Sequence, residues 1–142
     1  MAKSTQEDAD RPLLFSNDQG QLHIQIDHCA AELPGLMAKT REQINNAIAD
    51  GNVANAQQLS TRLAILTDEY GSVISYDILI ADQSQEMHDA IVGMAKVNKQ
   101  IAAIMAQTRS QAGFLSAVTP VVNGLSKIIG TAIKKKSKGA GS

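Results

Sequence analysis

The densest group of side chains that could do chemistry lies in one ten-residue stretch and comprises His23, Asp27, His28, Cys29 and Glu32. On a helix, His23 with Asp27 and His28 with Glu32 would form i,i+4 pairs, each presenting two donor groups on one face. Neighbouring residues point in different directions, so the run Asp27-His28-Cys29 does not form a catalytic triad. We interpret the group as surface polar residues around a small buried thiol.

Other enzymatic patterns are missing from the sequence. Gly51, Gly71, Gly93 and Gly113 are isolated, and none belongs to a phosphate-binding loop. A single cysteine excludes an internal disulfide and a multi-cysteine metal site. We therefore predict a protein that is not an enzyme and has no catalytic, cofactor-binding or metal site.

Composition points to helix packing rather than to a ligand pocket. The 142 residues are 44% hydrophobic but only 3% aromatic, so aliphatic side chains must fill the core. Few aromatic rings disfavour base stacking and ring-walled pockets. With its low charge density and few aromatic residues, the sequence is similar in composition to small helical proteins that bacteria or their phages export or build into particles.

Charge is divided unevenly along the chain, although the net charge is only -1. Residues 1–32 hold six acids against two bases, whereas residues 110–142 hold five lysines and no acid. The near-neutral total therefore conceals an acidic beginning and a basic end. We divide the chain into a polar acidic tail (1–20), a helical bundle (21–112), an amphipathic C-terminal helix with a basic end (113–138) and a flexible end (139–142).

The segment before Pro34-Gly35 allows two interpretations. Leu22, Ile24 and Ile26 alternate with polar residues after a turn-forming cluster, which indicates a short N-terminal β-hairpin. The alternative is a helix that ends before Pro34-Gly35. Residues 12–33 stay open between the two.

From Leu36 onward the pattern is helical, with breaks at Asp50-Gly51-Asn52 and before Ser84, a predicted N-cap. Two apolar seams follow the three-and-four spacing of packed helices. The seam residues are Leu59, Leu63, Leu66, Tyr70, Val73, Met87, Ile91, Met94 and Ile101. The short connections predict an all-α fold, either an up-and-down bundle or an elongated helical hairpin of three to four helices.

Polar and β-branched residues interrupt this pattern. Asp77 falls on the first seam and Asn98 borders the second, where a buried polar group can fix helix register. The alternative, which we favour, is that each residue marks the fraying end of its seam or points outward. Short extended structure within residues 73–80 is a further alternative, because β-branched residues cluster there.

The most distinctive segment is residues 114–138. Its apolar residues recur at helical spacing and would form one wide face, here called the C-terminal stripe: Phe114, Leu115, Val118, Val121, Val122, Leu125, Ile128, Ile129 and Ile133. Thr119-Pro120 predicts a helix start or a kink. The lysines, expected at the helix C-terminus, are Lys127, Lys134, Lys135, Lys136 and Lys138.

Three functions fit these features. Together, the seams and the C-terminal stripe contain more apolar surface than three short helices readily bury. This excess predicts a homo-oligomer or binding to another helical protein. Alternatively, the stripe enters a bilayer while the lysines contact an anionic membrane surface. Weak, non-specific nucleic-acid binding by the lysines ranks third, and we consider nucleic acid an improbable partner.

Localisation follows from the same patterns. The first eleven residues are polar and lack the apolar stretch of a secretory signal, so we expect synthesis in the cytoplasm. No window reaches eighteen continuous apolar residues, and Ser110 to Ile133 is too polar to be a conventional transmembrane span. Incorporation into a particle and export without a signal peptide are both compatible with this pattern.

Overall fold

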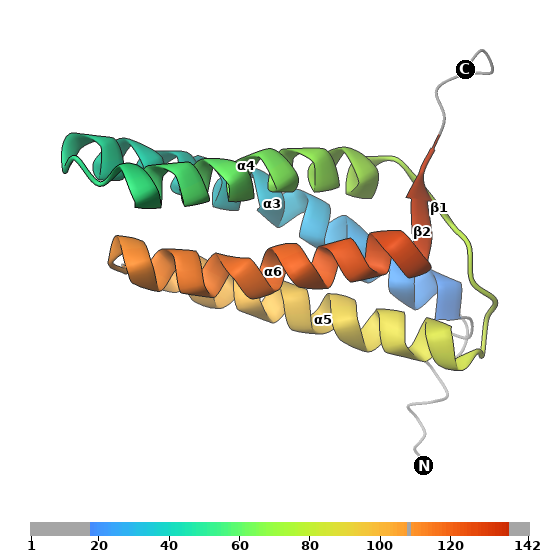
Figure 1. Ribbon diagram of the computed structural model, residues 1–142. Helices are drawn as coiled ribbons and strands as arrows, with labels where there is room; N and C mark the ends of the chain where they lie inside the picture. Colours follow the sequence, from blue (N-terminus) through green and yellow to red (C-terminus); the bar gives the residue numbers. More distant parts are fainter. Residues whose placement is uncertain (1–17, 108, 137–142) are drawn as a thin grey trace.

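The predicted all-α bundle is confirmed (Figure 1). The computed structural model describes residues 18–107 and 109–136, which form four helices and a small two-stranded sheet. The elements are α3 (Asp18–Ala49), α4 (Val53–Ile74), β1 (Tyr76–Ile78), α5 (Gln85–Ala106), α6 (Gln111–Thr131) and β2 (Ile133–Lys135). α3 packs against α4 and α5, and α6 packs against α5 and α4.

Helix α3 overturns two expectations for the N-terminal segment. It runs unbroken from Asp18 to Ala49, so the N-terminal β-hairpin and the helix end before Pro34 are both wrong. Leu22 and Ile26 are fully buried while Ile24 is 51% exposed. Spacing of four residues satisfies a helix as well as a strand, which is why the alternation misled.

The continuity of α3 through Pro34 follows from packing. Pro34 removes a helical hydrogen bond, at a cost of about 3 kcal/mol in a helix interior. Cys29, Leu33 and Leu36 are fully buried on both sides of it. Each large buried side chain contributes about 1.5–3 kcal/mol, so the continuous apolar face outweighs the proline.

The helix boundaries are set by small polar caps and one glycine. Gly51 has a φ of 74°, and Asn52 Oδ1 accepts a hydrogen bond from the Asn55 N–H at 3.0 Å, which confirms the predicted break. The Ser84 hydroxyl oxygen accepts from the Met87 N–H at 3.0 Å, as predicted. Ser110 caps α6 in the same way.

The start of α6 differs from the prediction at Thr119-Pro120. The helix begins at Gln111 and continues through Pro120. The Thr119 hydroxyl, next to the proline, donates a 2.8 Å hydrogen bond to the Leu115 carbonyl, so this side chain is hydrogen-bonded within the helix. Val118, Val121 and Val122 are buried on either side, so packing again decides the continuity.

The sheet joins two distant parts of the chain (Figure 1). β1 and β2 pair antiparallel, with Asp77 opposite Lys134. The Leu79 N–H donates to the Ala132 carbonyl at 2.7 Å, and the Lys136 N–H donates to the Ser75 carbonyl at 2.9 Å. The extended alternative for residues 73–80 is therefore right for Tyr76–Ile78 alone.

Candidate functional site

The predicted seams lie in the core of the bundle. Leu63, Tyr70 and Ile91 are partly buried. The remaining seam residues are buried, namely Leu59, Leu66, Val73, Met87, Met94 and Ile101. In this arrangement the seams hold the four helices to one another and leave no continuous strip for another chain.

The C-terminal stripe is also internal. Leu115 and Ile129 are partly buried. The other members are buried, namely Phe114, Val118, Val121, Val122, Leu125, Ile128 and Ile133. Among the described helices, α6 is long and apolar enough to cross a membrane, a test that the core helix of a soluble protein also passes. The stripe reaches a bilayer only if α6 leaves the bundle.

The lysines do not extend α6 as predicted. Lys127 is exposed on α6, which ends at Thr131, whereas Lys134 and Lys135 lie in β2. Lys136 is exposed beside β2, with its Nζ 3.9 Å from Asp77 Oδ1. Lys138 lies outside the described residues. Lysines on an exposed strand discourage pairing with another sheet edge.

The two polar seam positions have different outcomes. Asn98 is buried in α5, and its Nδ2 donates to the Gln25 carbonyl at 3.0 Å and to Gln25 Oε1 at 2.9 Å. This contact joins α5 to α3. Asp77 is exposed in β1, so it points outward as the favoured interpretation expects and does not fix helix register.

A polar cluster attaches the sheet to α3. His23 Nε2 lies 3.0 Å from Asp27 Oδ2, so the predicted i,i+4 pair forms. The Tyr76 hydroxyl lies 2.5 Å from His23 Nδ1. Burial and the neighbouring Asp27 carboxylate raise the pKa of Tyr76, which keeps its hydroxyl protonated. The cluster therefore acts as a hydrogen-bonded anchor rather than as a nucleophile.

A buried carboxyl lies between α4 and α6, and sequence reasoning missed it. Glu69 is only 4% exposed, and Ser126 Oγ donates to its Oε2 at 2.7 Å. Its Oε1 is buried without a hydrogen-bond partner among the described residues. Burial raises the pKa of Glu69 from 4.5 to about 7. Burial also raises the pKa of Cys29 to about 12, with Glu69 adding to the effect, so this thiol is unreactive.

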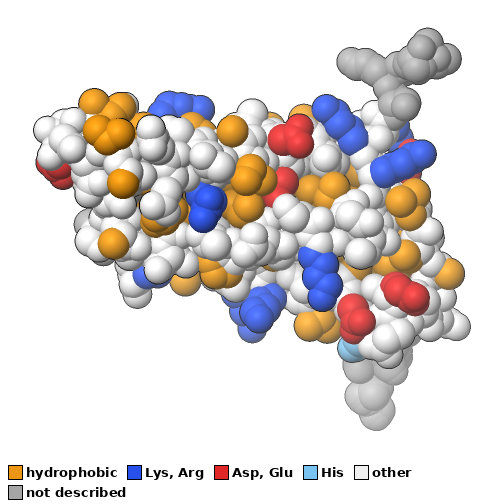
Figure 2. All heavy atoms as spheres, viewed as in Figure 1, with side chains coloured by type: hydrophobic (Ala, Val, Ile, Leu, Met, Phe, Trp, Pro, Cys, Tyr) orange, Lys and Arg blue, Asp and Glu red, His pale blue; other side chains and the backbone are white. Residues whose placement is uncertain are grey.

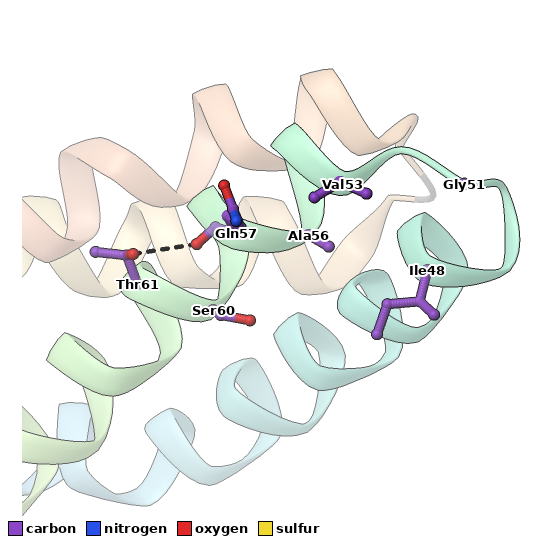
Figure 3. A pocket seen from close by; sticks show the side chains of 7 residues that line it. All are labelled: Ile48, Gly51, Val53, Ala56, Gln57, Ser60 and Thr61. Atoms are coloured by element: carbon purple, nitrogen blue, oxygen red, sulfur yellow. Dashed lines mark hydrogen bonds between the residues drawn. The ribbon is translucent and has the colours of Figure 1, made fainter.

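A shallow hollow lies at the α3–α4 turn (Figure 3). It encloses about 560 Å³ and is lined by Ile48, Gly51, Val53, Ala56, Gln57, Ser60 and Thr61. Ile48 and Val53 are each 63% exposed. The lining carries no charged or titratable side chain, and its polar side chains are those of Gln57, Ser60 and Thr61.

A larger groove runs between α5 and α6 and encloses about 610 Å³. Its lining residues are Glu86, Asp89, Ala90, Gly93, Lys96, Val97, Gln100, Thr119, Pro120, Asn123, Gly124, Lys127, Ile128 and Thr131. A Cβ added at Gly124 would lie 2.8 Å from Val97 Cγ2, so these two helices are close because glycine is there. The small residues give the α5–α6 groove its depth.

Charged side chains occupy the rims of this groove in a definite order. Gly93 lies beside Ile128 and Gly124 beside Val97, so Lys96 and Lys127 lie on opposite rims of the middle part of the groove, between these two contacts. Glu86 and Asp89 lie nearer the start of α5. Figure 2 shows acidic side chains over the sheet end of α5 and basic ones farther along α5 and α6.

The sequence held a signal for this groove that our prediction did not use. Ala90 and Gly93 are small residues three apart in α5, and Gly124 is a small residue in α6. Small residues at that spacing allow close helix approach, but the pairing of α5 with α6 had to be known first.

The chain matches no protein family, characterised protein or solved structure in comparisons of its sequence and fold. The structural class of the protein therefore rests on its own architecture, which is an antiparallel four-helix bundle with a charged outer groove. Within residues 18–107 and 109–136, no three His, Cys, Asp or Glu side chains form a group that could hold a metal.

Proposed function

We propose that this protein is a non-enzymatic interaction protein that receives a helical segment in the α5–α6 groove. The observation that carries the proposal is the groove itself, which combines small residues such as Gly93 and Gly124 with charged rims. Grooves of this kind recognise one face of an amphipathic helix through apolar contact, and rim charges select its orientation.

The burial of the other apolar surfaces supports the same choice. The seams and the C-terminal stripe pack inside the bundle, so they are unavailable to a partner without unfolding. Rim lysines Lys96 and Lys127 make no ion pair within the described part of the chain. They therefore present unneutralised charge to whatever occupies the groove.

Photo-crosslinking tests the proposal. A benzophenone amino acid in place of Asn123, an exposed groove residue, is expected to form adducts with a helical segment, identified by mass spectrometry. The yield should fall at high salt, because screening weakens the contacts of the charged rims. The same label in place of exposed Thr67 on α4 is the matched control. Equal adduct yields at the two positions would contradict the proposal.

A second candidate function is docking on an anionic membrane surface by the sheet end of the bundle. Lys134, Lys135 and Lys136 are exposed there. Leu79 lies beside the sheet, where its backbone N–H donates to the Ala132 carbonyl, and it is 56% exposed. Exposed lysines beside an exposed apolar side chain suit the headgroup region of a bilayer, each lysine contributing about 1 kcal/mol. This surface differs from the C-terminal stripe, which stays in the core.

Vesicle co-sedimentation tests this second function. Lys134→Glu with Lys136→Glu is expected to weaken binding to vesicles containing phosphatidylserine about tenfold or more, because two attractive charges become repulsive. Arg41→Glu with Lys99→Glu changes the net charge equally at exposed sites elsewhere. Identical retention of the two double variants, or equal binding to pure phosphatidylcholine, would exclude docking through this surface.

A further inference from the structure

We infer that the contact between α4 and α6 is a pH-sensitive opening in the bundle, at which ionisation of Glu69 separates the two helices around Ser126 and admits water. The opening lies on a different face of α6 from the α5–α6 groove, so it does not depend on the proposed function. Two features carry it, namely polar contacts between the helices and a buried carboxyl with an unpartnered oxygen.

The polar contacts join α4 to α6 at three levels, which are seven residues apart along α4. The pairs, donor first, are Asn55 Nδ2 with Gln111 Oε1 (3.2 Å), Arg62 Nε with Thr119 Oγ1 (3.2 Å) and Ser126 Oγ with Glu69 Oε2 (2.7 Å). Residues seven apart repeat on one side of a helix, so the three contacts follow one edge of the α4–α6 contact. Hydrogen bonds of this kind are exchanged for bonds to water at a small net cost. This edge therefore separates more readily than the apolar core does.

Glu69 makes the third level unstable once it is ionised. Its side chain is buried, and Oε1 has no hydrogen-bond partner among the described residues. Ser126, which bonds the other oxygen, is itself exposed, so the carboxyl lies just beneath the surface. A buried carboxylate needs several hydrogen bonds to replace its hydration, and this one receives a single bond within the described part of the chain. A small separation of the helices at Ser126 brings water to Oε1.

Negative and neutral groups face Glu69 from the elements around it. α3 contributes the Cys29 thiol, which interacts electrostatically with Glu69 and with Glu32. α6 contributes the neutral Ser126 hydroxyl, and Asp68 is the acidic neighbour on α4. An ionised Glu69 therefore meets repulsion from Asp68 and no opposing positive charge among these groups.

The cations on this side of the bundle do not neutralise Glu69. Lys135 Nζ lies against α4 two residues beyond Glu69, Arg62 lies two turns before it, and Lys127 lines the α5–α6 groove. No ion pair joins any of them to Glu69 within residues 18–107 and 109–136. Water is therefore the group that stabilises the ionised carboxylate, and it enters when the helices separate.

Burial raises the pKa of Glu69 from 4.5 to about 7, and this shift sets the direction of the pH effect. Separation of the helices rehydrates the carboxyl and returns its pKa toward 4.5, so the open form binds the proton less tightly than the closed form. Opening is therefore least favoured below pH 4.5 and becomes more favoured as the pH rises through 7. Between pH 6 and pH 8 the fraction of open molecules should increase about tenfold.

The sheet limits how far the helices separate. β1 follows α4 and β2 follows α6, and the two strands are paired. Opening around Ser126 leaves this pairing in place, together with the packing of α3 against α5. The opening is therefore local and differs from unfolding of the whole bundle.

Cys29 is a natural reporter of the opening. It is fully buried on α3, interacts with Glu69 and is the single cysteine of the chain. α3 lies behind α4 and α6 (Figure 1), so a small reagent that passes between those two helices reaches this thiol. Its reaction rate, relative to that of the urea-unfolded chain at the same pH, therefore measures how often the contact opens.

Labelling of Cys29 in the full chain with methyl methanethiosulfonate, at pH 6 and pH 8, tests the inference. The relative rate in the wild type is expected to rise about tenfold between the two pH values, and Glu69→Gln should abolish this rise. Ser126→Ala should extend the rise to higher pH, because the Ser126 hydrogen bond lowers the pKa of Glu69. Low concentrations of urea should change the wild-type rate at pH 8 only slightly, because a local opening exposes little surface.

The matched control is Asp68→Asn, which removes the exposed neighbouring carboxyl and should keep most of the rise. Circular dichroism confirms folding of each variant. Equal relative rates at pH 6 and pH 8 in the wild type, or the same rise in Glu69→Gln, would overturn the inference. It would also be overturned by a urea dependence of labelling as steep as that of global unfolding, because Cys29 would then react only in the unfolded chain.

Discussion

Replacing Phe114 with alanine is expected to lower the free energy of unfolding by about 3–5 kcal/mol, the range for truncating a large buried aromatic side chain. Phe114 is fully buried near the start of α6 and is the largest fully buried side chain among the described residues. Its removal would leave a cavity that the surrounding helices fill only in part. Urea denaturation followed by circular dichroism measures the loss.

The outcome at Phe114 also decides between two locations of the C-terminal stripe. Leu79→Ala is the control, because Leu79 is 56% exposed and its truncation should change stability by less than about 0.5 kcal/mol. A loss at Phe114 no larger than at Leu79 would show that the stripe does not pack in the bundle of the free protein. That result would favour a membrane-facing α6.

Glu69→Gln is expected to stabilise the protein above pH 7 by about 2–3 kcal/mol and to have little effect at pH 5. Burial raises the pKa of Glu69 from 4.5 to about 7, so the folded state binds a proton more tightly than the unfolded state does. Stability is therefore greatest below pH 4.5 with respect to this group and is lost as pH rises through 7. Glutamine is neutral and can still accept the Ser126 hydrogen bond.

Urea denaturation between pH 5 and pH 8 measures this effect. In the wild type, the contribution of Glu69 should decline across that interval, and the decline should be absent in Glu69→Gln. Asp68→Asn is the matched control, because Asp68 is the exposed neighbour of Glu69 and its neutralisation should leave most of the pH dependence in place. A parallel pH dependence in wild type and Glu69→Gln would show that this carboxyl ionises freely in the fold.

The sequence predicted the helices well where their apolar spacing was unambiguous. Leu66, Met87 and Met94 were predicted to lie on seams, and all three are fully buried. The prediction succeeded because an alternating three-and-four spacing of apolar residues fits only a helix. The break at Asp50-Gly51-Asn52 and the cap at Ser84 followed from local chemistry. The bundle was therefore predictable in class, although the alternatives that end a helix before Pro34 or start one at Pro120 are wrong. The packing that overrides a proline depends on helices distant in sequence.

The candidate site was predictable to a much smaller extent. The stripe from Phe114 to Ile133 was recognised as apolar, but its burial depends on α5 and α4. The strand at Lys134 and Lys135 needs β1 as its partner, and no local pattern reveals that pairing. The α5–α6 groove exists only once two glycines from different helices are brought together.

The sheet has a consequence for how the bundle can open. The chain between β1 and β2 contains α5 and α6, so the pairing of the two strands closes these helices into a non-covalent ring. While the strands stay paired, α5 and α6 cannot leave the bundle as a free segment. Backbone hydrogen bonds from Leu79 to Ala132 and from Lys136 to Ser75 extend the pairing at its two ends. Complete release of α6 from the bundle therefore requires the three residue pairs between β1 and β2 to separate. The stability of this short sheet thus limits how readily the core is exposed to solvent.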